Sequence, residues 1–390
     1  MLTAIFCARA FTPLEEIRDA AIVIDGARIA AIGSRDSIAI PSNARQVEMR
    51  GATLIPGFVD VHVHGAGGHD VMEASVEALD AIAETLARSG TTSFVATTVT
   101  AAPAEIYASA DRIANHIQTQ AANGGKSPAR AECLGIHFEG PFISAKRRGV
   151  HPEQWISPPA IPFLRRMLGH ADGCARILTL APELPGAIEL ADAAIAKGLI
   201  VSLGHTDATY EEAMAAIQRG ARHAAHVFNA MRPFSHRDTG VIGAVLTSAG
   251  VSAELIADDV HVDAAAMKML LAAKGAAGVT LVSDGTSATG MPDGNYRLGG
   301  FDVKVSGGVV RNAEGKLAGS ALTLDRALRN VVALGIEFKD VVRMLTLNPA
   351  RELGTESRKG VLAAGADADL VFLDEEMRIE RVVVRGTGAD

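Results

Sequence analysis

Between about residue 55 and residue 354, short runs of apolar residues alternate with longer segments whose apolar residues recur at helical spacing. Short apolar runs are typical of buried strands, whereas the helical spacing predicts amphipathic helices, so their alternation predicts repeated βα units. Eight runs are candidate strands: IPGFVDVHVH (55–64), TTSFVATTV (91–99), ECLGIHFE (132–139), ARILTLAPE (175–183), GLIVSLGH (198–205), RHAAHVFN (222–229), SAELIAD (252–258) and GVTLVSD (278–284). Eight such units predict a closed (β/α)8 barrel of the α/β class.

The two ends of the chain have a different pattern. Residues 1–54 read as short strands and turns, with a hairpin-type turn at Asp25-Gly26, and residues 355–390 also alternate β-rich runs with turns. Because sheet edges are usually covered and termini often lie close together, we expect both ends to form one small β-domain beside a barrel of residues 55–354. Within the barrel, helices are predicted over 75–90, 208–220 and 320–335, and a hairpin insertion over 301–319.

Composition and charge exclude several classes of protein. The 390 residues are 48% hydrophobic and 21% charged, which fits a globular α/β chain with a sizeable core. The net charge of -8 argues against nucleic acid as a partner, because that interaction needs clustered basic residues. Three widely spaced cysteines predict neither a disulfide framework nor a thiolate metal site. The sequence shows no leader pattern and no apolar run near the roughly 20 residues of a membrane span, so we expect a cytoplasmic protein with no membrane partner.

Polar residues close several of the predicted barrel strands. In a βα barrel the reactive groups lie where strands end and loops begin, so these residues are expected to meet at one rim. Strand side chains alternate, so both imidazoles of the His-Val-His run face the same side. The set comprises four histidines and two carboxylates: His62, His64, Glu139, His205, His226 and Asp284.

This set predicts a divalent metal site. Imidazole nitrogen and carboxylate oxygen suit zinc or another first-row ion, and several carboxylates without a thiolate are typical of catalysis rather than of structure. Such an ion acidifies water and polarises a carbonyl, which predicts hydrolysis, with a nearby carboxylate to carry the proton. A lone strand-end histidine is more often a packing or surface residue, so the prediction depends on the ordered set. Four histidines outside it are read as ordinary: His69, His116, His170 and His236.

His137 lies two residues before Glu139 and therefore on the same face of its strand. Two interpretations are equally open. The imidazole could orient the metal ligands from behind, as partners of ligating residues commonly do, or it could pack in the barrel interior.

Longer motifs around these positions resemble a known family. The segments that carry the resemblance are HFEGPFI (137–143), SLGHTDA (202–208), HVFNAM (226–231) and VSDGT (282–286), with PGFVDVHVHG, RRGVHP, LAGS, TLNPAR and GADADLV elsewhere. Over nearly the whole chain they are similar to the N-acetylglucosamine-6-phosphate deacetylases, a branch of the amidohydrolase superfamily. The resemblance implies a TIM-like barrel with a small β-sandwich, and a homodimer.

The resemblance also implies roles for individual residues. Glu139, His205 and His226 match ligands of the principal metal, and Asp284 matches the catalytic acid/base at the metal site. Since His62 and His64 are both present, a second ion bridged by Glu139 is an option. The resemblance therefore implies one or two divalent ions per chain, and the metal is zinc, iron or another first-row ion. The implied sugar and phosphate contacts are His151, Asn229, Ala230, Arg237 and His261. In the family this arginine reaches the site of the neighbouring subunit, and Arg suits phosphate through paired hydrogen bonds.

The implied reaction is deacetylation of N-acetylglucosamine-6-phosphate, with Asp284 taking the proton of metal-activated water and giving it to the departing amine. A deacetylase for the galacto epimer, N-acetylgalactosamine-6-phosphate, is not excluded by the motifs. A cyclic-amide hydrolase of the same superfamily is disfavoured, because such enzymes usually carry a carboxylated lysine on the fourth strand and residues 175–183 contain none. A barrel without catalysis, serving as a sugar-phosphate binding or assembly protein, is disfavoured because the ligand set is intact.

Overall fold

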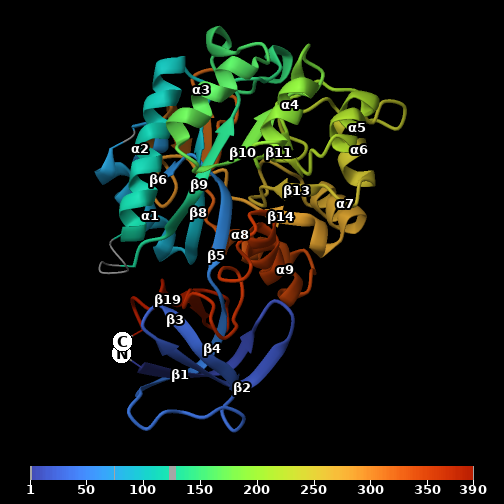
Figure 1. Ribbon diagram of the computed structural model, residues 1–390. Helices are drawn as coiled ribbons and strands as arrows, with labels where there is room; N and C mark the ends of the chain where they lie inside the picture. Colours follow the sequence, from blue (N-terminus) through green and yellow to red (C-terminus); the bar gives the residue numbers. More distant parts are fainter. Residues whose placement is uncertain (1, 74, 123–128, 390) are drawn as a thin grey trace.

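The computed structural model describes residues 2–73, 75–122 and 129–389, and its largest sheet is an eight-stranded parallel barrel (Figure 1). The strand order is β14-β13-β12-β11-β10-β9-β8-β5, so sequential strands are neighbours. His64 and Gly65 donate backbone N–H groups to Gly285 O at 2.8 and 2.9 Å, which closes the ring between the first and last strands. All eight strands expected from the sequence are present: β5 (Phe58–Val63), β8 (Thr91–Thr98), β9 (Glu132–Glu139), β10 (Ala175–Leu180), β11 (Ile200–Leu203), β12 (His223–Ala224), β13 (Ser252–Leu255) and β14 (Val279–Leu281).

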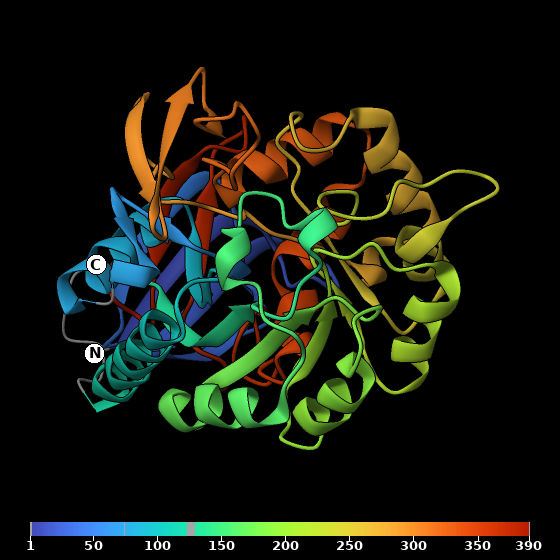
Figure 2. The same cartoon turned by 90° about the horizontal axis from the view of Figure 1, so that it is seen from above.

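Helices surround this barrel when it is viewed from above (Figure 2). The predicted helix over 208–220 is typical: Thr209 and Glu212 form a capping box at its start, and Gly220, with φ +109°, follows its end. The α-helices are α1 (Val76–Arg88), α2 (Pro103–Ala122), α3 (Ile161–Ala171), α4 (Ala187–Ile195), α5 (Tyr210–Gln218), α6 (Gly240–Thr247), α7 (Ala264–Lys274), α8 (Leu324–Ala333), α9 (Phe338–Leu345) and α10 (Leu347–Glu352). Short 3-10 helices lie at 71–73, 145–147, 153–155 and 276–278. Two short strands, β6 (Gly65–Ala66) and β7 (His69–Asp70), pair with each other. None of the helices in the described ranges is long and apolar enough to cross a membrane.

A second sheet joins the two ends of the chain, as expected. Its order is β19-β18-β4-β1-β2-β3, and the antiparallel pairing of β18 with β4 brings Leu370 opposite Pro56. Apolar side chains cover both faces of this sheet. Consecutive residues of a strand point to opposite faces, and Ile5 and Phe6 of β1 belong to two different core clusters. The strands are β1 (Leu2–Phe11), β2 (Glu16–Asp25), β3 (Arg28–Ser34), β4 (Arg45–Pro56), β18 (Leu370–Leu373) and β19 (Ile379–Val383). The predicted fold class is therefore confirmed, whereas the domain boundaries stay predictions.

The predicted hairpin insertion over 301–319 forms part of a small three-stranded sheet at the rim of the barrel. The strands are β15 (Gly294–Leu298), β16 (Phe301–Ser306) and β17 (Val309–Asn312), and all pairings are antiparallel. Leu298, Phe301, Leu317 and Gly319 line the pocket at the strand ends. The insertion thus supplies one wall of the pocket, a role that its sequence did not indicate.

A buried ion cluster joins the start of β9 to the C-terminal segment. Lys359 is 1% exposed, and its Nζ lies 2.7 Å from Glu132 Oε2, 2.9 Å from Asp367 Oδ2 and 2.6 Å from Asp369 Oδ2. Arg358 adds a paired hydrogen bond to the Glu132 carboxylate at 2.6 and 3.0 Å. Each charge has partners, so removing one would leave another uncompensated in a buried site.

Replacing Glu132 with Gln should lower the free energy of unfolding at pH 7 by on the order of 3 kcal/mol. Burial raises the pKa of Glu132, but the Arg358 hydrogen bond and the charges of Lys359 and Arg358 outweigh this and bring it from 4.5 to about 2. A depressed carboxyl pKa stabilises the fold fully above the unfolded value, near 4.5, and this stability is lost as pH falls through about 2. In denaturant unfolding, the difference between the two proteins should therefore shrink from pH 6 to pH 3.

The matched control is Glu84→Gln, which removes a partly exposed ion pair with Arg130 at 2.8 Å. This variant should lose at most about 1 kcal/mol, because exposed pairs contribute little. Equal losses in the two variants, or a difference that grows as the solution becomes more acidic, would contradict the role assigned to the buried cluster.

Candidate metal centre and active site

The carboxyl ends of the barrel strands surround a pocket of about 170 Å³. Five of the six predicted metal-site residues line it: His64, Glu139, His205, His226 and Asp284. The sixth, His62, is fully buried, and its Nε2 approaches two of these residues, lying 3.4 Å from Glu139 Oε1 and 3.7 Å from Asp284 Oδ1. The structure therefore brings together all six residues that the sequence singled out.

Glu139, the last residue of β9, stands at the centre of this cluster. Its Oε1 lies 2.9 Å from His226 Nε2 and 3.1 Å from His205 Nε2. Its Oε2 lies 3.4 Å from His64 Nε2 and 3.2 Å from His151 Nε2. Imidazoles from several strands thus converge on one carboxylate, an arrangement that a single divalent ion or a pair of ions can use.

The hydrogen bonds behind each ring assign the tautomers of these histidines. His64, His205 and His226 place Nδ1 at 2.9, 3.0 and 3.2 Å from backbone carbonyl oxygens, those of Thr97, Arg147 and Asn229 respectively. Nδ1 must carry the hydrogen to donate there, so in the neutral form of each ring the nitrogen that faces the pocket is the unprotonated Nε2, the form that ligates metals.

His151 has the opposite arrangement. Its Nδ1 accepts the backbone N–H of Thr100 at 3.1 Å, so the ring hydrogen lies on Nε2, 3.2 Å from Glu139. A protonated nitrogen cannot ligate an ion but can donate to a substrate oxygen. This geometry separates His151 from the metal-ligand set and agrees with the substrate-contact role that the sequence predicts for it.

Three of the site residues have backbone conformations that are rare for residues other than glycine. His205, His226 and Asp284 have φ values of +48°, +28° and +49°. Each follows the end of a barrel strand, where the left-handed turn points the side chain into the pocket. Such conformations cost about 1–3 kcal/mol each and persist where the surrounding structure holds them, which is typical of functional sites.

The charges of the cluster shift several pKa values. Burial raises the pKa of Glu139, yet the imidazoles of His205 and His62 hold it well below its usual value. Burial lowers the pKa of His64, but the hydrogen bonds that it donates to Asp284 and Glu139 raise it to about 9. Burial likewise raises the pKa of Asp284, whereas His64 and His62 bring it below the ordinary value, so this carboxylate is ionised at neutral pH.

The residues present fit a divalent cation. Within the described part of the chain, Nε2 of His62 is a buried polar atom without a hydrogen-bond partner, although it faces both site carboxylates. A buried orphan of this kind calls for an explanation, and a bound ion provides one. The donors are imidazole nitrogen and carboxylate oxygen, which suit zinc and iron better than calcium or magnesium.

Four of the five predicted substrate contacts line the same pocket: His151, Asn229, Ala230 and His261. Asn229 Nδ2 is buried and has no partner among the described residues, so it can donate to a ligand. His261 Nδ1 is 2.8 Å from Asp258 Oδ2, which fixes the ring at the pocket wall. The fifth residue, Arg237, is exposed and lies outside the pocket lining of its own chain.

The histidines read as ordinary lie outside the pocket lining. His69 pairs with Glu73 at 3.0 Å, and His170 stacks on Tyr107. His137 has partners at both nitrogens, with Nδ1 at 3.3 Å from Val61 O and Nε2 at 2.7 Å from Thr179 Oγ1. Its ring contacts His62 edge-on, with a centroid distance of 4.7 Å, so it supports the site without facing the pocket.

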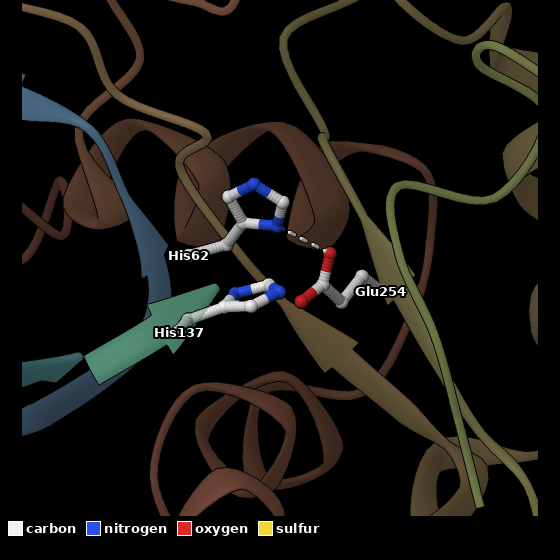
Figure 3. Close-up of side chains that lie close together, drawn as sticks. All are labelled: His62, His137 and Glu254. Atoms are coloured by element: carbon white, nitrogen blue, oxygen red, sulfur yellow. Dashed lines mark hydrogen bonds and ion pairs between the residues drawn. The ribbon is translucent and has the colours of Figure 1, made fainter. Parts of the chain in front are cut away.

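Sequence reasoning missed the buried acids behind the site. Glu254, in the middle of β13, is fully buried and lies 2.8 Å from His62 Nδ1 (Figure 3). Asp60 accepts the backbone N–H of His62 at 3.2 Å, and burial raises its pKa to about 7. The available signal was an acidic residue inside an apolar strand, because carboxylates are almost never fully buried without partners.

Known proteins are similar to this chain over most of its length. A model of the amidohydrolase family matches residues 53–388. The N-acetylglucosamine-6-phosphate deacetylase of Lysinibacillus sphaericus is 38% identical over 343 residues, covering 87% of this chain and 86% of that protein. The N-acetylgalactosamine-6-phosphate deacetylase of Escherichia coli O157:H7 is 37% identical over 365 residues, covering 93% of each. The Mycobacterium smegmatis N-acetyl-D-glucosamine-6-phosphate deacetylase, solved as a mutant with N-acetyl-D-glucosamine-6-phosphate, superposes with a TM-score of 0.92 at 33% identity, covering 100% of this chain and 99% of that one.

Proposed function

The chain belongs to the amidohydrolase family, and on this basis we propose that it is the enzyme that hydrolyses N-acetylglucosamine-6-phosphate to glucosamine-6-phosphate and acetate. One observation carries the proposal: four imidazoles from the ends of three barrel strands present Nε2 to the Glu139 carboxylate, and Asp284 lies 3.2 Å from His64 Nε2 at the same pocket. This donor set supports metal-dependent hydrolysis of an amide.

The proposed principal metal ligands are Glu139, His205 and His226. His62 and His64 with Asp284 are the proposed ligands of a second ion, and Glu139, which lies within 3.4 Å of Nε2 of both histidines, would serve both positions. Zinc is the ion we propose, with iron as the alternative. A divalent ion held there would supply a Lewis acid that polarises the amide carbonyl and acidifies water.

Asp284 is the proposed general acid and base. Its carboxylate is ionised because His64 and His62 hold its pKa down despite burial, so it can accept a proton from the attacking water. The new C–O bond forms at the acetyl carbon, the C–N bond breaks, and Asp284 returns its proton to the departing amine nitrogen. Acetate and the amino sugar are the products, and Asp284 is regenerated as the carboxylate.

The proposed substrate contacts divide between the acetyl group and the sugar phosphate. His151, with hydrogen on Nε2, and Asn229, with its free amide, can donate to substrate oxygens. Ala230 and His261 complete this part of the pocket. The phosphate contact is proposed for Arg237 of a second copy of the chain, which makes a homodimer the working form.

Acetate release tests the proposal. The assay compares N-acetylglucosamine-6-phosphate with its galacto epimer and with unphosphorylated N-acetylglucosamine, before and after chelation of the enzyme. Metal-dependent turnover that favours the phosphorylated gluco sugar is expected. Faster turnover of the galacto epimer would favour the second candidate, an N-acetylgalactosamine-6-phosphate deacetylase, which the Escherichia coli relative supports. Folded, metal-loaded enzyme that releases no acetate from any of them would overturn both.

Arg237→Ala should lower kcat/KM for the phosphorylated sugar by about 10- to 100-fold and leave the unphosphorylated sugar unaffected, because one charge-assisted contact contributes about 1.5–3 kcal/mol. Arg219→Ala, at an exposed arginine that pairs with Asp192, is the matched control.

Mixing Arg237→Ala chains with Asp284→Asn chains tests the arrangement between subunits. One site of each mixed dimer then holds both Asp284 and a neighbour's Arg237, so activity should reappear on mixing. If activity does not reappear in verified mixed dimers, Arg237 does not contact the phosphate in the site of the neighbouring chain.

A further inference from the structure

Glu254 is a fully buried carboxylate that the proposed reaction does not use. It lies in β13, and its side chain meets His62 and His137 inside the barrel (Figure 3). Burying an ionisable carboxylate is unfavourable unless hydrogen bonds and charges compensate. The partners of Glu254 therefore indicate what the position requires.

One oxygen of this carboxylate contacts two of the proposed metal-ligand residues. Oε2 accepts from His62 Nδ1 at 2.8 Å and from the backbone N–H of His226 at 2.9 Å. The other oxygen, Oε1, lies 3.3 Å from His223 Nε2. Glu254 thus fixes the ring of His62 and also the backbone of His226, the residue with the strained φ of +28°.

His62 differs from the other three proposed ligand histidines in what its Nδ1 contacts. Those of His64, His205 and His226 face neutral backbone carbonyl oxygens, whereas that of His62 faces a carboxylate. A hydrogen bond to an ionised acceptor is roughly twice as strong as one between neutral groups. It also makes the opposite ring nitrogen a more basic ligand.

His62, His137 and Glu254 also lie close enough together to be considered as a cation site. The contacts of His137 argue against this. Its Nε2 is 2.7 Å from the Thr179 hydroxyl and its Nδ1 is 3.3 Å from Val61 O, so both nitrogens already have protein partners. Within this group Glu254 accepts a hydrogen bond from His62, whereas His137 only packs its ring edge-on against that of His62.

We propose that Glu254 is a positioning residue that holds His62 with its hydrogen on Nδ1, so that Nε2 can ligate, and thereby sets the metal affinity of the His62–His64 pair. The proposal rests on the proposed function only in assuming that this pair binds metal. Glu254 touches neither the pocket nor the reacting atoms, so its effect passes through His62 and the turn at His226.

Zinc binding provides the test, because it can be read without substrate. In zinc buffered by a competing chelator, Glu254→Ala should bind its weakest-held zinc ion about 10- to 100-fold less tightly than the original protein. Glu254→Gln should lose less, because an amide oxygen in the place of Oε2 still accepts both hydrogen bonds. The matched control is Thr179→Val, which removes a buried polar partner of His137 and should leave zinc affinity unchanged. Unchanged zinc affinity in Glu254→Ala overturns the proposal.

A second measurement tests the position of the hydrogen on His62 and does not require Glu254→Ala to fold. In zinc-loaded protein of the original sequence, labelled with ¹⁵N-histidine, His62 should show a slowly exchanging proton on Nδ1, with its signal identified by its loss in His62→Gln. A proton on Nε2 instead overturns the proposal. Zinc affinity that responds to Glu254 in an enzyme that releases no acetate would reject the proposed function and keep this inference, so the two failures are distinguishable.

Discussion

Replacing Asp284 with Asn should lower the turnover number for deacetylation by about 10³-fold or more while zinc content stays close to that of the original protein. Asparagine keeps the shape of the side chain, and its amide oxygen can still face His64, 3.2 Å away in the present structure. It cannot accept the proton of the attacking water, nor deliver one to the leaving nitrogen. The loss should therefore appear in kcat, with KM changed little, and the measurement is steady-state acetate release with zinc analysis of the same samples.

Asp263→Asn is the matched control for this variant. Asp263 caps α7 by accepting the N–H of Ala265 at 2.8 Å, and asparagine is an equally good N-cap, so neither stability nor turnover should change. Asp284→Asn enzyme that keeps its zinc and retains more than about a tenth of the original kcat would remove Asp284 from proton transfer. If zinc is lost together with activity, the other proposed role of Asp284, as a ligand of the second ion, accounts for the loss.

The fold could be predicted because its determinants are local and repeated. Each barrel strand is buried on both faces, so it appears in the sequence as a short apolar run, and the helices between the runs keep their own spacing and caps. The candidate site followed from the same rule, since parallel strands bring their carboxyl ends to one rim. Strand-end residues as distant as His62 and Asp284 could therefore be placed together from their positions in the sequence alone.

The support behind the site could not be predicted in this way. Glu254 lies inside its strand rather than at its end, and its importance depends on which ring nitrogen of His62 it meets. The tautomers that separate His151 from the ligand histidines depend on single backbone groups such as the N–H of Thr100. These contacts join strands that are distant in sequence, and the spacing of residue types along one strand carries no information about them. The wall that β15–β17 gives to the pocket was missed for the same reason.

Glu139→Gln should abolish both zinc binding and acetate release, with kcat lowered by about 10³-fold or more even in excess zinc. The Glu139 carboxylate lies within 3.4 Å of Nε2 in all four proposed ligand histidines. Glutamine removes the negative charge that attracts the cation and turns an NH₂ group, a donor, toward nitrogens that must act as ligands. The imidazoles lose a partner that stabilises their protonated forms, so their pKa values should fall and the chain should remain folded in its neutral-histidine form.

The control for Glu139→Gln is Glu183→Gln, a change at another carboxylate of the same rim. Glu183 follows β10 and accepts from the Thr206 hydroxyl and the Asp207 backbone N–H, both at 2.6 Å, without contacting a site histidine. The Glu183→Gln variant should keep its zinc, and any loss of turnover should be far smaller than in Glu139→Gln. Mass-spectrometric zinc analysis and acetate release on both variants make the comparison. If Glu139→Gln bound zinc with the original stoichiometry and affinity, the central position of Glu139 among the imidazoles would reflect packing, and the metal would have to be held by the histidines and Asp284 alone.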